Sequence, residues 1–309
     1  MIPRLDHRDP VPGSLRGAIL ALGNFDGFHL GHQAVVGAAV DWARNEGRPA
    51  IVATFDPHPV RHFVPDTPPF RLTTLDQRET LFAATGAAAM LVFHFDAALA
   101  ATSAEDYVCE LLAKHIGAAG VVTGEDFTFG KGRSGNRQRL VELGAGCGLK
   151  ARSVGPVLDG GAPVSSSRVR AALQAGDPQE AARLMTRPFA VRGVVEHGDK
   201  VGRTIGYPTA NVALGSYLRP RYGIYAVTGT LPDGRVLNGA ANMGIRPSFD
   251  PPKELLEPYF FDFAEDLYGQ EIEVAFHHFL RPEAKFADLE ALVAQMERDC
   301  DTARTLLGS

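Results

Sequence analysis

The stretch LGNFDGFHLGHQ, from Leu22 to Gln33, indicates how the first part of the chain folds. It follows a short apolar run at 18–22, and it leads into an amphipathic run that ends at Gly47. A second apolar run then covers 49–55. An apolar strand, a glycine-rich turn, a helix and another strand are typical of a βαβ unit. The stretch therefore lies where the first strand of a parallel sheet passes into a helix.

The same alternation continues toward the middle of the chain. Helix-like runs at 75–85 and 103–117 each precede an apolar strand, at 87–95 and at 118–124. Strands that alternate with helices predict a doubly wound parallel α/β sheet of Rossmann-like type, with helices on both faces. Ligands of such sheets bind at the carboxyl ends of the strands, which is where Leu22–Gln33 lies.

The pattern changes after about Met185. Short β-rich runs are separated by Gly, Pro and Asp turns at 189–198, 223–231, 235–244, 257–263 and 270–280, and one helix at 286–307 follows them. Regular short strands of this kind predict an antiparallel barrel or sandwich, and LPDG at 231–234 is a hairpin turn. We therefore expect two domains, residues 1–186 and 187–309.

Composition excludes several classes of protein. Hydrophobic residues make up 45% of the 309 residues, which is an ordinary value for a globular protein. The formal net charge of −5 argues against non-specific binding to nucleic acid or to a membrane surface. No apolar stretch is long enough for a transmembrane helix, and the N-terminal residues do not resemble a secretory signal. Cys109, Cys147 and Cys300 fit no zinc spacing, so we expect reduced thiols in a cytoplasmic protein. The sequence leaves the oligomeric state open.

Two histidines stand on the opening turn of the first helix. His29 and His32 are three residues apart, so they lie on one face. The preceding glycines let backbone amides approach a ligand, and the helix directs its positive end toward it. Imidazoles placed there can donate hydrogen bonds to phosphate oxygens. The alternative is an ordinary pair of polar groups at a helix start, or a metal-binding pair.

A second helix start resembles the first. PVSSSRVRAALQAGD, at 163–177, places three serines before an apolar-periodic helix, with Arg168 and Arg170 on its first turn. Hydroxyls, free amides and an arginine fork form an anion site. By itself the segment can equally be a serine-capped surface helix.

A third candidate lies in the second half of the chain. VEHGDKVGRTIGYPTANV, from Val195 to Val212, combines glycines with Lys200 and Arg203, although no GxxxxGK[ST] motif exists in the chain. Thr209 and Asn211 alternate on an extended segment, so their side chains point the same way. Neutral oxygens of this kind suit Mg²⁺ carried by a nucleotide. The alternative is a hairpin with ordinary turn glycines.

Together these segments resemble a known family. His29-Leu30-Gly31-His32 and Ser166-Ser167-Arg168-Val169-Arg170 are similar to the HxGH and SSTxxR signatures of the nucleotidylyltransferase superfamily. The resemblance narrows to the adenylyltransferase module of the bacterial bifunctional riboflavin kinase/FAD synthetase family through three further segments, namely TFDPHPV at 54–60, RLTTLDQR at 71–78 and TGEDFTFGKGRSG at 123–135. The resemblance implies a module that converts FMN and ATP into FAD and pyrophosphate.

The resemblance also implies roles for single residues of this module. His29, His32 and Arg170 would be catalytic and would grip the triphosphate. The ATP-binding residues would be Gly23, Asn24, Phe25, His29, His32, Asp126, Ser166, Ser167 and Arg170. His58, in DPHP, would line the flavin or the adenine side, with the flavin preferred, although the two prolines can equally form a rigid turn.

The second half resembles the riboflavin kinase module of the same family, a six-stranded antiparallel barrel. The segments that carry this resemblance are GDKVGRTIGYPTAN, NGAANMGIRPSF and LLEPYFFDFAEDLYGQEIEVAFHHFLRPEAKF. They imply Mg²⁺ ligands at Thr209 and Asn211, ATP-binding residues Gly198, Lys200 and Gly202, flavin-binding residues Asn242 and Arg246, and the catalytic base Glu257. Pro258 departs from the family pattern and removes a ladder donor from this strand. Glu254 is out of phase with Glu257.

The expected protein is thus a bifunctional enzyme that makes FMN from riboflavin and ATP and FAD from FMN and ATP, with Mg²⁺ and small-molecule substrates only. Three alternatives remain. One module has lost its activity, although no catalytic residue type is missing. HxGH also occurs in class I aminoacyl-tRNA synthetases, but the chain has no KMSKS-like segment and no basic stripe. The third alternative is a flavin-binding protein without catalysis.

Overall fold

A computed structural model describes residues 1–197, 206–246 and 253–308. The chain forms two compact units. The first unit comprises Met1–Pro68 and Thr74–Ser165, and the second comprises Pro69–Thr73 and Ser166–Ser309. The short piece 69–73 joins the second unit by pairing, because Arg71 forms an isolated bridge with Tyr217 there.

The first unit is built on a six-stranded parallel sheet with strand order β1-β4-β3-β2-β5-β6. Its strands are β1 (Arg4–Asp6), β2 (Ile19–Leu22), β3 (Ala50–Phe55), β4 (Ala89–Phe93), β5 (Gly120–Gly124) and β6 (Lys150–Val154). β2 and β3 are buried along their whole length, which explains their unbroken apolar sequence. The prediction of a doubly wound parallel sheet is confirmed.

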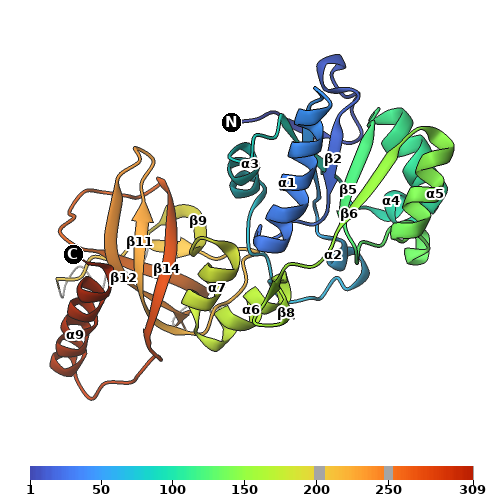
Figure 1. The fold of residues 1–309 in the computed structure, drawn as a ribbon. Coiled ribbons are helices and arrows are strands. Elements are labelled where there is room, and N and C mark those ends of the chain that lie inside the picture. The colour runs from blue at the N-terminus through green and yellow to red at the C-terminus, as the bar shows by residue number, and fades with distance from the viewer. Residues whose placement is uncertain (198–205, 247–252, 309) are drawn as a thin grey trace. The chain divides into compact units, whose positions relative to one another are not determined.

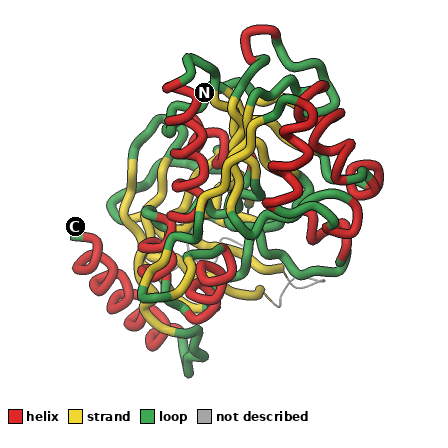
Figure 2. Tube along the Cα trace, turned by 45° about the vertical axis from the view of Figure 1, so that its right-hand side comes forward, coloured by secondary structure: helices red, strands yellow, loops and turns green. Residues whose placement is uncertain are grey.

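Helices cover both faces of this sheet (Figures 1 and 2). Helices α1 (Leu30–Asn45) and α3 (Leu75–Ala83) pack on one face, and α4 (Ala97–Ala101), η2 (Asp106–His115) and α5 (Arg137–Cys147) pack on the other. η2 is of π type, and the short helices α2 (Pro59–Phe63), η1 (Gly13–Leu15) and η3 (Lys131–Arg133) lie in loops. The first unit ends with a small hairpin of β7 (Leu158–Asp159) and β8 (Ala162–Pro163).

The strand order places the loop after β2 at a topological switch point. From β2 the chain builds β3 and β4 on one side, and it then returns to add β5 on the other side of β2. The carboxyl ends of β2 and β5 therefore flank the crevice where open α/β sheets bind their ligands. The loop that carries His29 begins directly after Leu22, at this edge.

The second unit contains a closed antiparallel barrel with strand order β10-β13-β12-β11-β14-β9. The strands are β9 (Phe189–Glu196), β10 (Asn211–Ala213), β11 (Gly223–Thr230), β12 (Val236–Arg246), β13 (Lys253–Phe260) and β14 (Glu271–Arg281). The LPDG turn joins β11 to β12, with hydrogen bonds between Leu231 and Arg235 and between Gly234 and Leu231. The sequence left barrel and sandwich open, and the chain forms the barrel.

In the described part of the second unit, three helices accompany the barrel. Helices α6 (Ser166–Ala175) and α7 (Pro178–Met185) precede it, and α9 (Leu289–Leu307) follows it. Figure 1 shows α9 beside β12, where Ala303 closes a small apolar cluster with Ala226 and Ala240. Arg281 on β14 holds α9 through an ion pair with Asp299, 2.7 Å long.

Several expectations need correction. β13 begins at Lys253 rather than at Glu257, and it ends before Asp262, whose positive φ of 55° breaks the extended backbone. β1 and β6 were not predicted. Cys109 and Cys147 form a disulfide with 5.6 Å between their Cα atoms, so the expectation of reduced thiols was wrong for this pair. η2 packs against α5, and sequence spacing does not reveal such a contact. Cys300 has a free thiol.

Within the described ranges, the chain contains no helix with the length and apolar character that crossing a bilayer requires.

Candidate active sites

The loop after β2 is held in an unusual backbone conformation. Phe25 and Phe28 have positive φ angles of 49° and 43°, a region that residues other than glycine rarely adopt. Both rings are buried against Phe82 of α3, with centroid distances of 5.9 and 5.2 Å. Thr54 of β3 donates a hydrogen bond of 2.8 Å to the carbonyl oxygen of Asn24. The packing around the loop thus fixes a shape that the loop alone does not favour.

His29 and His32 come together at the start of α1. His29 is the N-cap, and its Nδ1 accepts a hydrogen bond from the backbone amide of His32. The two imidazole rings stack with 3.7 Å between their centroids, and His29 is only 5% exposed. The ring of Phe25 meets the ring of His32 edge to face at 5.3 Å. Both imidazoles therefore stand at the positive end of α1, and the burial of His29 strengthens its interaction with an anion.

Position 31, directly before His32, has room only for a very small residue. A Cβ atom built on Gly31 would lie 3.1 Å from Cε1 of His29 and 3.3 Å from the carbonyl oxygen of Val164. These distances are tighter than ordinary van der Waals contacts. The chain enters α6 at Ser166, two residues after Val164.

Asp126 lies just beyond the carboxyl end of β5. A Cβ at Gly124 would meet Oδ1 of Asp126 at 2.9 Å, so the glycine lets this side chain fold back over the strand end. Because β5 is the neighbour of β2 in the sheet, Asp126 follows the strand on the far side of the switch point. This is the edge at which the sequence predicted a nucleotide contact.

His58 opens α2 and stands next to an aromatic surface. Its Nδ1 accepts a hydrogen bond from the amide of Val60, and it follows a cis peptide bond between Asp56 and Pro57. The side chains of His62, Phe63 and Phe95 contact one another edge to face, and Phe63 is 62% exposed. We call these three residues the aromatic shelf. An exposed apolar surface of this kind suits a planar ring.

Ser166, Ser167 and Arg170 begin α6 in the second unit. The Nε atom of Arg170 donates a hydrogen bond of 2.9 Å to the carbonyl oxygen of Phe70, and its guanidinium lies 5.2 Å from the centre of the Phe70 ring. Arg168 forms an ion pair with Glu180 on α7, which anchors α6 rather than a ligand. The segment 69–73 therefore supports the arginine that the sequence singled out.

The barrel aligns three polar residues across neighbouring strands. Asn242 of β12 stands opposite Glu257 of β13, and Nδ2 of Asn242 donates a hydrogen bond of 3.4 Å to Oε2 of Glu257. Val212 of β10 pairs with Leu256 of β13, so the same register brings Asn211 opposite Glu257. Directly opposed residues of antiparallel strands share a face. Asn211, Glu257 and Asn242 thus form one row, which we call the barrel row.

Glu254 is already engaged elsewhere. It forms an ion pair of 2.7 Å with Arg219, and it accepts a hydrogen bond from the hydroxyl of Tyr222. Burial opposes ionisation of Glu254, but the bonds from Tyr222 and Arg219 outweigh it and lower the pKa of this carboxyl. Burial and the bond to Glu254 raise the pKa of Tyr222 to about 12. Glu254 therefore has a structural role.

Pro258 does not interrupt β13. Its carbonyl oxygen accepts a hydrogen bond of 2.9 Å from the amide of Ala210, and Pro258 pairs with Ala241 on the other side. Glu257 keeps its place in the ladder, and it is 8% exposed.

Some predicted residues cannot be placed in full. Gly198, Lys200 and Gly202 lie outside the described residues. Arg246 ends β12, and only its backbone is described. Thr209 is half-buried and precedes β10 by two residues, so it continues the face of Asn211.

Buried polar atoms mark both candidate sites, and two of them belong to residues that the sequence singled out, Asn24 and Asn242. Among the described residues, four buried side-chain atoms have no hydrogen-bond partner. They are Oδ1 of Asn24, the hydroxyls of Tyr107 and Thr123, and Oδ1 of Asn242. Asn24 lies in the loop after β2, and Asn242 lies in the barrel row. Buried acceptors without partners are costly, so both sites have groups that a ligand can satisfy.

A buried ion pair between Asp26 and Arg78 was also missed. Arg78 was noticed only as the last residue of RLTTLDQR, and Asp26 only as part of a turn. Two charged residues 52 positions apart give no local signal.

Comparisons with known proteins cover both halves of the chain. The family model described as FAD synthetase matches residues 11–168, and the model described as riboflavin kinase matches residues 185–307. A bifunctional riboflavin kinase/FMN adenylyltransferase of Escherichia coli K12 is 39% identical over 94% of this chain and 93% of its own length. The protein of the same name from Bacillus subtilis is 36% identical over 91% and 90%.

A solved structure agrees with the fold. The crystal structure of a protein titled macrolide-efflux protein from Streptococcus pneumoniae is 29% identical, with a TM-score of 0.88 over 98% of this chain and 99% of that chain.

Proposed function

The chain belongs to the bifunctional riboflavin kinase/FMN adenylyltransferase family, and we propose that the residues described above carry out its two reactions. The enzyme phosphorylates riboflavin to FMN with ATP, and it transfers the adenylyl group of a second ATP to FMN, which gives FAD and pyrophosphate. We assign adenylyl transfer to the loop after β2 and to the start of α6. We assign riboflavin phosphorylation to the barrel row.

In adenylyl transfer, a phosphate oxygen of FMN attacks the α-phosphorus of ATP, and the bond to the pyrophosphate oxygen breaks. Two anions must approach in line, so the site has to supply donors rather than a covalent nucleophile. His29, His32 and the first amides of α1 would neutralise the charge that develops on the phosphates. The stacked histidine pair at the positive end of α1 is the observation that carries this assignment.

The other residues of this site would bind the ends of the substrates. Arg170 would hold the triphosphate as a bidentate donor, with Ser166 and Ser167 at its far end. Gly23, Asn24 and Phe25 would lie along the nucleotide, and Asp126 would contact it from β5. The loop after β2 belongs to the first unit and α6 belongs to the second unit. We propose that both bind the same ATP.

FMN would bind on the side of α2. Two residues of the aromatic shelf, His62 and Phe63, follow His58 on α2, and the shelf would offer an apolar surface to the isoalloxazine ring. This arrangement supports the assignment of His58 to the flavin.

In the kinase reaction, Glu257 would accept the proton of the ribityl hydroxyl as its oxygen attacks the γ-phosphorus of ATP, and ADP leaves. Asn242 and Arg246 would contact the flavin. Gly198, Lys200 and Gly202 would contact the phosphates of ATP. The barrel row carries this assignment, because it brings Glu257 opposite Asn211 and within hydrogen-bond distance of Asn242.

We also propose that Thr209 and Asn211 hold Mg²⁺. Their donors are neutral oxygens, which suit a hard cation that arrives with a nucleotide. Asn211 is 8% exposed and stands in a row that contains the unpartnered Oδ1 of Asn242, so this face has oxygen acceptors to offer. When bound, Mg²⁺ would neutralise charge on the transferred phosphate.

Two broader expectations remain proposals. The adenylyltransferase would comprise residues 1–186 and the kinase residues 187–309, which cleavage at an engineered protease site after Thr186 would test by assay of both products. A cytoplasmic location would suit an enzyme that consumes two ATP molecules, and cell fractionation with an antibody to the native protein would test it.

One incubation with riboflavin, ATP and Mg²⁺, followed by mass spectrometry, tests the site assignment. The native chain should produce FMN and FAD. His29→Ala should lower FAD formation by about 100-fold, as loss of a transition-state donor does, and should leave FMN formation intact. Asn211→Ala should abolish FMN formation but spare FAD made from supplied FMN. Intact FAD formation by His29→Ala would refute the first assignment.

A further inference from the structure

Asp26 and Arg78 form an ion pair in the interior of the first unit. The Nη2 atom of Arg78 lies 3.0 Å from Oδ1 of Asp26, and both side chains are only 2% exposed. Nη1 of the same guanidinium donates a hydrogen bond of 3.1 Å to Oγ1 of Thr54. A buried ion pair adds little net stability, because both charges lose their water. What the pair adds beyond an apolar pair of the same size is a set of directional hydrogen bonds, which fix the positions of its partners.

The bonds of Arg78 reach the loop after β2 at two points. Arg78 binds Asp26 directly, and Thr54, which accepts from Arg78, donates in turn to the carbonyl oxygen of Asn24 at 2.8 Å. One guanidinium from α3 and one hydroxyl from β3 thus fix Asn24 and Asp26. The residue between them is Phe25, whose positive φ of 49° needs such support.

Phe25 connects this support to the histidines. Its ring meets His32 edge to face at 5.3 Å, and His32 stacks on His29 at 3.7 Å. A change in the backbone at Phe25 would therefore move the ring that contacts His32 and, through His32, shift His29. Small displacements of this kind matter in phosphoryl transfer, where alignment provides most of the catalysis.

We propose that Asp26, Arg78 and Thr54 are positioning residues for adenylyl transfer: the buried pair and its hydroxyl relay hold Phe25 in its strained conformation and thereby aim His29 and His32 at the α-phosphorus of ATP. This inference rests on the proposed role of the histidines. None of the three residues touches substrate in this account, so their effect falls on kcat more than on the affinity for ATP.

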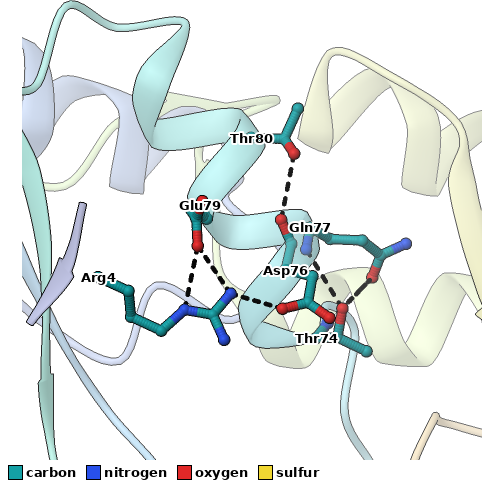
Figure 3. A network of polar contacts seen from close by, with 6 residues as sticks. All are labelled: Arg4, Thr74, Asp76, Gln77, Glu79 and Thr80. Carbon is teal, nitrogen blue, oxygen red and sulfur yellow. Dashed lines mark hydrogen bonds and ion pairs between the residues drawn. The ribbon is translucent and has the colours of Figure 1, made fainter. Parts of the chain in front are cut away.

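The same helix provides a matched control. Glu79, next to Arg78 on α3, forms an ion pair of 2.8 Å with Arg4 of β1. Figure 3 shows this second network, in which Arg4 also bonds to Asp76, while Thr74 and Gln77 cap the start of the helix. Glu79→Gln removes an ion pair from α3 but leaves Arg78 and its partners in place.

The test compares Arg78→Lys, Thr54→Val and Glu79→Gln in the full chain. Lysine keeps the charge but lacks the fork that binds two partners at once, and valine keeps the shape of threonine without its hydroxyl. Steady-state kinetics of FAD formation give kcat and the KM for ATP. The kinase reaction is an internal control for the second unit. Fluorescence of Trp42, the single tryptophan, reports folding of the first unit, where it is 3% exposed.

We expect kcat for FAD formation to fall by about 10-fold or more in Arg78→Lys and by about 3-fold or more in Thr54→Val. The KM for ATP should change less than kcat, the Trp42 spectrum should stay native, and Glu79→Gln should match the native chain. If Arg78→Lys loses the native Trp42 spectrum, Thr54→Val decides the question alone.

Three results would overturn the inference: native kcat in the folded variants, a loss confined to the KM for ATP, or an equal loss in Glu79→Gln. His29→Ala separates this inference from the proposed function. If His29→Ala is inactive in FAD formation while Arg78→Lys and Thr54→Val are active, only the positioning role fails. If His29→Ala is active, the site assignment itself fails.

Discussion

Asn242 donates a hydrogen bond to Glu257 across β12 and β13, with 3.4 Å between Nδ2 and Oε2. The bond leaves Oδ1 of Asn242 buried and, among the described residues, without a hydrogen-bond partner. The amide therefore orients the carboxylate with its nitrogen and presents an acceptor with its oxygen. Glu254, three residues before Glu257 on β13, is bound instead by Arg219 and Tyr222.

Glu257→Gln should block the kinase reaction. The amide keeps the size of the carboxylate but cannot accept a proton as a base does, so kcat for FMN formation should fall by about 100-fold or more. FAD formation from supplied FMN should stay within about 2-fold of the native rate, because the other site performs it. Separate assays of the two products measure both effects.

Glu254→Gln is the control for this prediction. It removes a carboxylate from the same strand and breaks the ion pair with Arg219. We expect unchanged kinase kcat in the folded protein. Equal loss of kinase activity in both variants would show that Glu257 has no special role as a base.

Gly31→Ala should reduce FAD formation without unfolding the protein. Alanine favours helix over glycine by about 1 kcal/mol, but its Cβ would lie 3.1 Å from the imidazole of His29. The ring must shift by a few tenths of an ångström, so adenylyl transfer should slow by several-fold, by about 10-fold at most. Urea unfolding followed by Trp42 fluorescence and the rate of FAD formation measure the two effects.

Gly37→Ala lies on the same helix and has open space around its new Cβ. This control should gain stability and keep its native rate of FAD formation. If Gly31→Ala is as active as Gly37→Ala, close packing against His29 has no catalytic consequence.

The stability of the first unit should depend on the protonation of His7. Burial lowers the pKa of His7 from its usual 6.5, and Arg8 adds to this effect, while Asp6 and Asp96 oppose it. The Nδ1 atom of His7 accepts a hydrogen bond of 3.0 Å from the amide of His94, which a proton there would remove. The unfolded chain therefore binds the proton more tightly than the folded chain does.

The stability that neutral His7 contributes to the first unit is therefore fully present above pH 6.5, and it is lost as the pH falls through the lowered pKa of the folded state. Urea unfolding followed by Trp42 fluorescence should show a falling free energy of unfolding between about pH 7 and pH 5. His7→Gln should flatten this dependence. An equally steep profile in His7→Gln would assign the effect to other groups.

Reduction of the Cys109–Cys147 disulfide should destabilise the first unit. The bond closes a segment with a sequence separation of 38 residues, and cross-links of such length typically contribute about 2–4 kcal/mol. Unfolding in urea with and without a reducing agent measures the difference. Cys300→Ser should leave it unchanged. Labelling of all three thiols in the denatured protein without reductant would contradict the disulfide.

Much of the fold could be predicted because its signals are local. Buried strands at 18–22 and 49–55 appear as unbroken apolar runs, and the helix between them has its own period. β1 and β6 gave no comparable signal, because Arg4–Asp6 is short and polar and Lys150–Val154 is only partly buried at the sheet edge. Strands at sheet edges are defined by the neighbour they pair with more than by their own composition.

The shared helix turn of His29 and His32 and the shared face of Thr209 and Asn211 could be predicted from spacing alone, because helices and strands repeat with fixed periods. Folding alone brings Asn242 opposite Glu257, Arg78 to Asp26 and Cys109 to Cys147. These contacts join residues 15, 52 and 38 positions apart. Strand register and helix packing set such contacts through the burial of the whole core, and no local spacing encodes them.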